Sequence, residues 1–262
     1  MGKLKYLIDR ARSISFTLFN RIENNNNANF SSNGEERFLH ELFERFSGPV
    51  VLFDIGGNIG GYSEILVGEC RRRSMKFTLH VFEPTASCFG ILRSKFNNDA
   101  DVHLNNVGVS NVAGAREIFY DVEKSGFASL YQRNLESLNV EMKQKEAISL
   151  IRLEEYLLST GVRGIDFLKI DIEGHELHAF EGMGKYLHGD FIKVIQFEYG
   201  GANLDSRTNL LDLYTLLTSR GFVICKIMRN SIEQRNYQSW MDNFQYANYL
   251  AISKQFYPLL KK

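Results

Sequence analysis

Cysteine, excess charge and long apolar runs are all scarce in this chain of 262 residues. Its three cysteines, Cys70, Cys88 and Cys225, are odd in number and form no CxxC pair. A disulfide framework or zinc site is therefore not expected, and a cytoplasmic location fits. Basic and acidic residues each number 31, and this balance gives no sign of a nucleic-acid partner. No apolar run approaches the roughly 20 residues of a transmembrane helix.

The first residues are basic and partly apolar. Between Met1 and Glu23, lysines and arginines interrupt the apolar positions throughout, so the segment is not a secretory signal. The pattern predicts a basic amphipathic helix, for which peripheral membrane contact is one interpretation. The preferred one is a helix laid against the domain or a partner. Because an asparagine-rich run reads as a linker, we expect a helical and linker extension at 1–29 and one domain at 30–262.

The rest of the chain alternates strand-like and helix-like segments. A continuous apolar run at 50–55 predicts a strand buried on both faces. Such alternation predicts an α/β fold with an open, mostly parallel sheet and helices on both faces. Further strands are expected at 77–82, 102–109, 165–170, 191–198 and 222–227, and helices at 60–70, 86–95, 175–187 and 207–219.

Two regions depart from this regularity. Residues 110–164 carry strand-like pieces around a polar, helix-prone stretch, and they are expected to form an insertion with a hairpin and part of a lid. The strand-like segment Gln245–Ser253 follows its predecessor without a helix, so it is expected to lie antiparallel near the edge of the sheet.

The first strand ends in a glycine-rich loop. Asp54, Gly56, Asn58 and Gly60 stand in a D-x-G-x-N-x-G arrangement at the start of a predicted helix. Glycines permit a tight turn, and the helix N-terminus offers free N–H groups. A dinucleotide site requires glycine where Asn58 stands, because a side chain there would crowd a pyrophosphate. S-adenosylmethionine has no phosphate; its carboxylate suits the loop N–H groups and its ammonium suits Asp54. The arrangement therefore favours this cofactor.

The next two strand ends extend the expected cofactor site. Glu83 ends the second strand 23 positions beyond Gly60, where an acid can bind both ribose hydroxyls. Asn106 and Val107 end the third strand, where they are placed to contact the edge and face of the adenine. A glycine-rich turn and polar strand ends without any ligand are the alternative.

Four motifs in order resemble the FkbM-type methyltransferases: FDIGGNIGGYS (53–63), VFEP (81–84), NVGVSN (106–111) and DFLKIDIEGHE (166–176). The resemblance runs from about Val50 to about Ile227. It implies a Rossmann-like methyltransferase fold with seven strands, the seventh antiparallel, and methyl transfer to a hydroxyl on a sugar, glycan or secondary metabolite. This chain has Gly57 where the family usually has alanine and Gly61 where an aromatic residue is frequent.

Acidic residues gather where the acceptor should bind. Asp171 ends the fourth strand, Glu173 and His175 follow it, and Glu198 ends the next strand. Methyl transfer to a hydroxyl requires aligned reactants and removal of a proton, for which Asp171, Glu173 or His175 is a candidate base. Alternatively, Asp171 and Glu198 hold Mg²⁺, because oxygen ligands suit a hard cation.

Two other functions remain open from the sequence. A nicotinamide-dependent oxidoreductase uses a similar sheet, but Asn58 and the lack of a Tyr-x-x-x-Lys pair oppose it. A non-catalytic scaffold of the same fold has no need to keep the loop, Glu83 and Asp171 together. The identity of the acceptor and the oligomeric state are not encoded in any motif.

Overall fold

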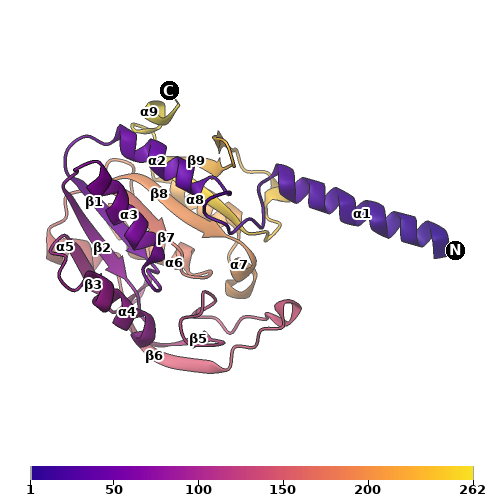
Figure 1. The fold of residues 1–262 in the computed structure, drawn as a ribbon, viewed down its shortest axis with the longest axis horizontal. Helices are drawn as coiled ribbons and strands as arrows, with labels where there is room; N and C mark the ends of the chain where they lie inside the picture. The colour runs from indigo at the N-terminus through magenta and orange to yellow at the C-terminus, as the bar shows by residue number, and fades with distance from the viewer. Residues whose placement is uncertain (1, 262) are drawn as a thin grey trace.

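The computed structural model describes residues 2–261 and centres on one large twisted sheet (Figure 1). Its strand order is β10-β9-β11-β8-β7-β1-β2-β3. All neighbours are parallel except β11, which is antiparallel to both β8 and β9, and β10, which is antiparallel to β9. The strands are β1 Val50–Ile55, β2 Phe77–Phe82, β3 Val102–Asn105, β7 Ile165–Ile170, β8 Ile192–Tyr199, β9 Phe222–Ile227, β10 Ile232–Gln234 and β11 Ala247–Ser253.

Helices cover both faces of this sheet, as the alternating sequence predicts. Strand β1 illustrates the arrangement: Leu52 packs into a core shared with α2, α3 and α4, whereas Phe53 packs into a core shared with α5, α6 and α8. Successive strand residues point to opposite faces, so each parallel strand is buried twice. The helices are α2 Glu35–Arg45, α3 Gly61–Arg72, α4 Ala86–Phe96, α5 Leu153–Thr160, α6 Glu176–Gly182, α7 Gly201–Ser206, α8 Leu210–Ser219 and α9 Tyr257–Leu260.

This is the Rossmann-like methyltransferase fold, with one strand more than expected. The large sheet has eight strands rather than seven, because the short β10 adds an antiparallel edge. As expected, the segment Gln245–Ser253 forms an antiparallel strand near the edge: β11 lies between β8 and β9, third from the edge that β10 forms. Every residue of β11 is buried, because the strand has a neighbour on each side.

A second sheet stands at the carboxyl ends of the large one. It has the order β4-β6-β5, with β4 Gly108–Val109, β5 Gly114–Tyr120 and β6 Gln144–Ile151. The strand expected at 102–109 is thus divided between the two sheets. The stretch between β5 and β6 holds a single 3₁₀ turn, Glu136–Leu138, in place of the expected helical character. Figure 1 shows this sheet as a separate layer below the main one.

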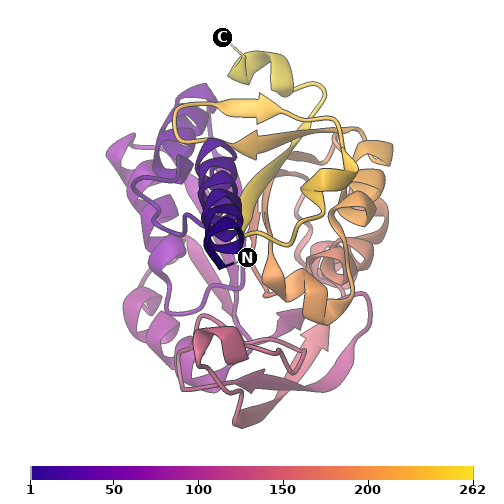
Figure 2. The same cartoon turned by 90° about the vertical axis from the view of Figure 1, so that its right-hand side faces the viewer.

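Helix α1, Gly2–Ile22, projects away from the body (Figures 1 and 2). All side chains from residue 3 to residue 18 are exposed, so the helix is not laid against the domain; its packing on a partner stays a prediction. The asparagine run is packed and not a free linker: the Asn24 side chain donates to the carbonyls of Asn33 and Ile227. No helix within residues 2–261 is both long and apolar enough to cross a membrane.

Candidate active site

The glycine loop between β1 and α3 passes very close to neighbouring backbone. Gly56 has a φ of 91°, and a Cβ there would overlap the carbonyl of Asp171. Asn58 also has a positive φ, of 44°, which asparagine tolerates better than most residues. A Cβ on Gly57 would lie 2.5 Å from a methyl group of Val81, whereas Gly61 has open space around it. Val81 therefore fills the volume that an alanine at position 57 would need.

Glu83 fastens the loop to the end of β2. One carboxylate oxygen accepts the backbone N–H of Asn58 at 2.9 Å, and the other accepts the N–H and hydroxyl of Thr85 at 2.9 and 2.5 Å. Its side chain is buried, and burial raises its pKa. Hydrogen bonds from N–H groups favour the charged form and oppose that shift.

Asp54 lies beneath the loop. Its carboxylate accepts the Ser63 hydroxyl at 2.5 Å and is 1% exposed. Burial raises the pKa of Asp54 to about 6, and the Ser63 hydrogen bond opposes the rise. The side chain therefore supports the first turn of α3, and any ligand contact would pass through the loop or a bridging water.

A cavity of about 200 Å³ opens beside the loop, between the two sheets. Of the residues expected to hold the cofactor, Gly56, Asn58, Glu83 and Val107 line it, whereas Asp54, Gly60 and Asn106 do not. Gly60 instead provides the left-handed residue before α3, with a φ of 85°. Asn106 is exposed and donates its amide to the carbonyls of Glu83 and Pro84 at 2.9 and 3.0 Å.

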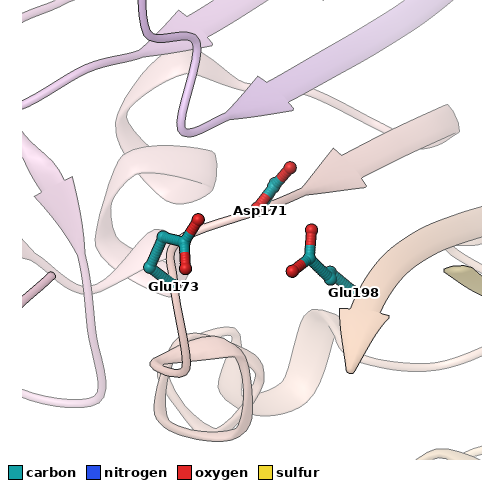
Figure 3. Close-up of side chains that lie close together, drawn as sticks. All are labelled: Asp171, Glu173 and Glu198. Carbon is teal, nitrogen blue, oxygen red and sulfur yellow. The ribbon is translucent and has the colours of Figure 1, made fainter. Parts of the chain in front are cut away.

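Three carboxylates meet at one side of the cavity. Asp171, Glu173 and Glu198 each offer an oxygen, and these oxygens lie within 4.8 Å of one another. Figure 3 shows Asp171 and Glu173 on the segment that follows β7 and Glu198 at the end of the adjacent β8. Asp171 and Glu173 also line the cavity, together with His175. We call Asp171, Glu173 and Glu198 the acidic cluster.

Two cations border the acidic cluster. Lys169, whose side chain is 5% exposed, donates to Asp171 at 2.9 Å. Arg133 pairs with Glu173 and, at 3.3 Å, with Asp205. Burial raises the pKa of Glu173 to about 8 despite Arg133, with Asp171 adding to the rise. Burial, followed by Asp171 and Glu173, also raises the pKa of Glu198 far above its usual range. Crowded acids of this kind favour bound protons or cations.

His175 is held on both ring nitrogens. Nε2 lies 2.9 Å from the Ser110 hydroxyl and Nδ1 lies 2.8 Å from the Tyr131 hydroxyl. The ring stacks on His178, with centroids 4.7 Å apart. Burial and, secondarily, His178 lower the pKa of His175 to about 4. A neutral imidazole occupied by two hydroxyl groups is better suited to positioning Tyr131 than to accepting a proton from substrate.

The insertion supplies residues that the sequence did not single out. Ile118, Tyr120, Lys124 and Ser125 line the cavity from the small sheet and its loop. The Asn58 amide reaches the Ser125 carbonyl at 3.4 Å and so joins the glycine loop to the insertion. Arg133 joins the insertion to the turn after β7 and to α7. No motif marks these positions, because their function depends on contacts between distant segments.

The chain is similar to known methyltransferases. A sequence model of the methyltransferase FkbM domain matches residues 54–224. The methyltransferase sdnD of Sordaria araneosa is 26% identical over 178 residues, 58% of this chain and 66% of that protein. Among solved structures, an FkbM methyltransferase from Methylobacillus flagellatus is 17% identical with a TM-score of 0.49, covering 78% of this chain and 44% of that one. Fibrillarin of Aeropyrum pernix, with natively bound S-adenosylmethionine, is 9% identical with a TM-score of 0.42, covering 85% of this chain and 76% of that one.

Proposed function

The chain belongs to the FkbM methyltransferase family, and we propose that it transfers a methyl group from S-adenosylmethionine to a hydroxyl of a sugar, glycan or secondary-metabolite acceptor. The observation that carries the proposal is a cavity that Gly56, Glu83 and Asp171 line together. The chain spans just under two thirds of the length of its curated relative, 66%. The proposed activity is therefore argued from the residues that line the cavity, not from that relative.

The residues around the cavity fit the cofactor. Glu83 offers carboxylate oxygens for the ribose hydroxyls, and its contacts with Asn58 and Thr85 fix its position beforehand. Val107, Ile118 and Leu150 supply an apolar boundary suited to the adenine. When bound, S-adenosylmethionine supplies a methyl group already activated by a positive sulfonium.

The acidic cluster fits the acceptor side of the reaction. Asp171 is paired with Lys169 and Glu173 with Arg133, so their charges are partly neutralised. The Glu198 carboxylate makes no hydrogen bond or ion pair among the described residues, and its pKa is raised by burial and the neighbouring acids. A positive group placed nearby lowers the proton affinity of such a carboxyl. In this proposal Glu198 takes the proton from the acceptor hydroxyl, and Asp171 aligns that hydroxyl for transfer. His175 holds Tyr131 in place.

Mg²⁺ is a second candidate for this cluster. Three carboxylates with oxygens within 4.8 Å of one another form a set that a hard cation can bind. Lys169 and Arg133 already contribute two positive charges, which reduces the attraction for a divalent ion. Thermal shift with MgCl₂, in the parent and in Glu198→Gln, decides between them: stabilisation of the parent alone assigns the cluster to Mg²⁺.

The site favours a small acceptor over nucleic acid. Basic and acidic residues each number 31, so the chain carries no excess of positive charge that would attract a phosphate backbone. The side chain of Asn58, which contacts Cys88 and Ser125, stands where a dinucleotide site requires glycine, and this opposes nicotinamide chemistry. An open cavity opposes a purely structural role. Three free cysteines support a cytoplasmic location.

Calorimetry with S-adenosylmethionine, S-adenosylhomocysteine and NAD tests the cofactor. We expect the first two to bind and NAD not to bind; binding of NAD alone would refute the proposal. Incubation with methyl-labelled S-adenosylmethionine and separate small-molecule, glycan and RNA extracts then tests the acceptor. Label transferred to a hydroxyl supports the proposal, and label found only in RNA overturns the acceptor class.

A further inference from the structure

Helix α1 displays apolar side chains that nothing in the described chain covers. Figures 1 and 2 show the helix projecting from the body. Leu4, Leu7, Ile14 and Ile22 are 59–66% exposed. The helix meets the body only near its end, where the Phe19 ring packs against Trp240 with centroids 5.8 Å apart. Exposed apolar groups in such number indicate an interaction surface.

These side chains form one stripe. At 100° per residue, seven apolar positions fall on the same side of the helix, with Ser15 as the polar residue among them. The helix is about 30 Å long at 1.5 Å per residue. We call these seven positions the apolar stripe. They are Leu4, Leu7, Ile8, Ala11, Ile14, Leu18 and Ile22.

Basic residues border the apolar stripe on both edges. By the same helical geometry, Lys5 and Arg12 follow one edge, and Lys3, Arg10 and Arg21 follow the other. Asp9 is the single acid of the helix and pairs with Arg12 at 3.2 Å. The opposite side carries Ser13 and Asn20, and also the aromatic rings of Tyr6 and Phe16.

This charge pattern indicates what kind of partner binds the apolar stripe. A second copy of α1 packed on the stripe would bring basic edges against basic edges in either orientation. A surface of anionic lipids attracts both edges at once and receives the apolar side chains between its headgroups. We propose that α1 lies in the plane of an anionic lipid bilayer, with the apolar stripe in the acyl boundary and the flanking lysines and arginines at the headgroups.

The segment that follows the C-terminal end of α1 is bonded to the body near the acidic cluster. Asn26, four residues beyond α1, donates its backbone N–H to the carbonyl of Tyr246 at 2.8 Å and accepts the Tyr246 N–H at 3.2 Å. Tyr246 directly precedes Ala247 and Asn248, which pair with Tyr199 and Glu198 at the end of β8. A bilayer bound along α1 would therefore lie close to the acidic side of the cavity. The lipid binding does not depend on the proposed function.

Flotation of the full chain with vesicles tests the proposal. The vesicles contain phosphatidylcholine alone or with about 30 mol % phosphatidylglycerol. We expect at least about tenfold stronger binding to the anionic vesicles, weakened in about 0.5 M NaCl because salt screens the basic edges. Equal binding to both vesicle types, or none, overturns the proposal.

Two variants with the same charge change separate the stripe from net charge. Ala11→Asp with Leu18→Asp places two acids on the stripe, and Ser13→Asp with Asn20→Asp places two on the opposite side, also seven positions apart. We expect the first pair to reduce anionic-vesicle binding at least about tenfold more than the second. If both double variants lose vesicle binding equally, the proposal that the apolar stripe inserts into the bilayer is overturned. Parent dimers that form without lipid and are lost only in the stripe variant assign the stripe to a second copy.

A melting curve of each variant completes the experiment. Ala11, Ser13 and Leu18 are exposed, and an aspartate at position 20 can still accept the Asn25 amide that Asn20 accepts at 3.1 Å, so the body should melt as in the parent. Unchanged melting with lost flotation supports the proposal. If melting falls in the stripe variant, Leu18→Asp alone is compared with Ser13→Asp, and equal flotation of these single variants overturns it.

Discussion

The backbone N–H of Asn58 donates to the carboxylate of Glu83 at 2.9 Å and so connects the glycine loop to the tip of β2. The acid on which the cofactor site depends is therefore also a structural support of the loop. The same carboxylate accepts two hydrogen bonds from Thr85 at the start of α4. Loop, strand and helix are thus held in one geometry before any ligand arrives, which reduces the ordering cost of binding.

Glu83→Ala should weaken both folding and cofactor binding. It leaves the N–H groups of Asn58 and Thr85 without their acceptor, which costs about 1–3 kcal/mol of unfolding free energy. We expect affinity for S-adenosylmethionine to fall at least tenfold, about 1.4 kcal/mol. Denaturant titration and calorimetry measure the two effects. Glu146→Ala is the control, because Glu146 accepts the Ala86 N–H without lining the cavity. Parent-like affinity in Glu83→Ala would remove Glu83 from the cofactor site.

The sequence predicted the strand tips because parallel topology fixes where they end. β1 lies between β2 and β7, and β8 lies beside β7, so the acids at their carboxyl ends share one edge of the sheet. The apolar runs at β1, β7 and β9 also marked these buried strands well. Local patterns predict these strands correctly because a continuous apolar run indicates a strand that is buried on both faces.

Contacts between distant segments escaped the sequence. Asp54 was expected on the ammonium side of the cofactor, directly or through water; its carboxylate accepts the hydroxyl of Ser63, nine positions away, and is not part of the cavity lining. Arg133 lies 40 positions from Glu173 and 72 from Asp205, with no periodic pattern between them. The position of β11 in the strand order depends on tertiary packing, because every residue of the strand is buried and its own pattern does not identify its neighbours. Tertiary packing decides these features, and one sequence does not display it.

Asp171→Asn should abolish methyl transfer and leave cofactor affinity nearly intact. The variant also removes the carboxylate that faces the buried Lys169, with Asp171 itself 36% exposed. Solvent screening limits the resulting loss of stability to about 1–3 kcal/mol. Lys169→Met added to Asp171→Asn should restore part of it, because the uncompensated cation disappears. A double-mutant cycle in denaturant measures the coupling. Restored folding without turnover in the double variant separates the chemical role of Asp171 from its structural one. Unchanged turnover in Asp171→Asn would contradict the chemical role.

Stability of the ligand-free protein should fall as pH rises from about 6.5 to about 8. Burial raises the pKa of Glu176 from 4.5 to about 7 and that of Glu173 from 4.5 to about 8. The folded state therefore keeps protons that the unfolded chain has already released, and this advantage disappears as pH passes the folded pKa values. His175, with its pKa lowered from 6.5 to about 4, acts in the opposite direction only below that window.

Glu176→Gln should flatten this pH dependence. Its amide oxygen can still accept the N–H groups of Ile172 and Gly174, which Glu176 accepts at 3.0 and 3.2 Å. Glu176→Ala loses both acceptors and should lower the unfolding free energy by about 1–3 kcal/mol. Melting temperatures recorded every half pH unit compare the three proteins. A parent-like slope in Glu176→Gln would show that Glu176 does not hold its proton in the folded state.

Arg133→Met should loosen the insertion over the cavity. Arg133 pairs with Glu173 and Asp205, and its guanidinium lies 5.7 Å from the centre of the Phe127 ring. The pairs are largely buried, so their loss costs about 3 kcal/mol. Removing this cation also removes the one group that lowers the pKa of Glu173, so Glu173 should keep its proton to higher pH.

Hydrogen exchange and stopped-flow release measure the consequence. Amides of the loop 121–131 should exchange faster in Arg133→Met, and S-adenosylmethionine should dissociate at least about tenfold faster because the insertion opens more often. Arg116→Met is the matched control: Arg116 lies in the same insertion but is exposed and bonds only its neighbouring carbonyl. It should leave exchange and release unchanged. If Arg133→Met and Arg116→Met behave alike, the insertion is held by the packing of β5 and β6 alone, and the ion pairs of Arg133 do not govern access to the cavity.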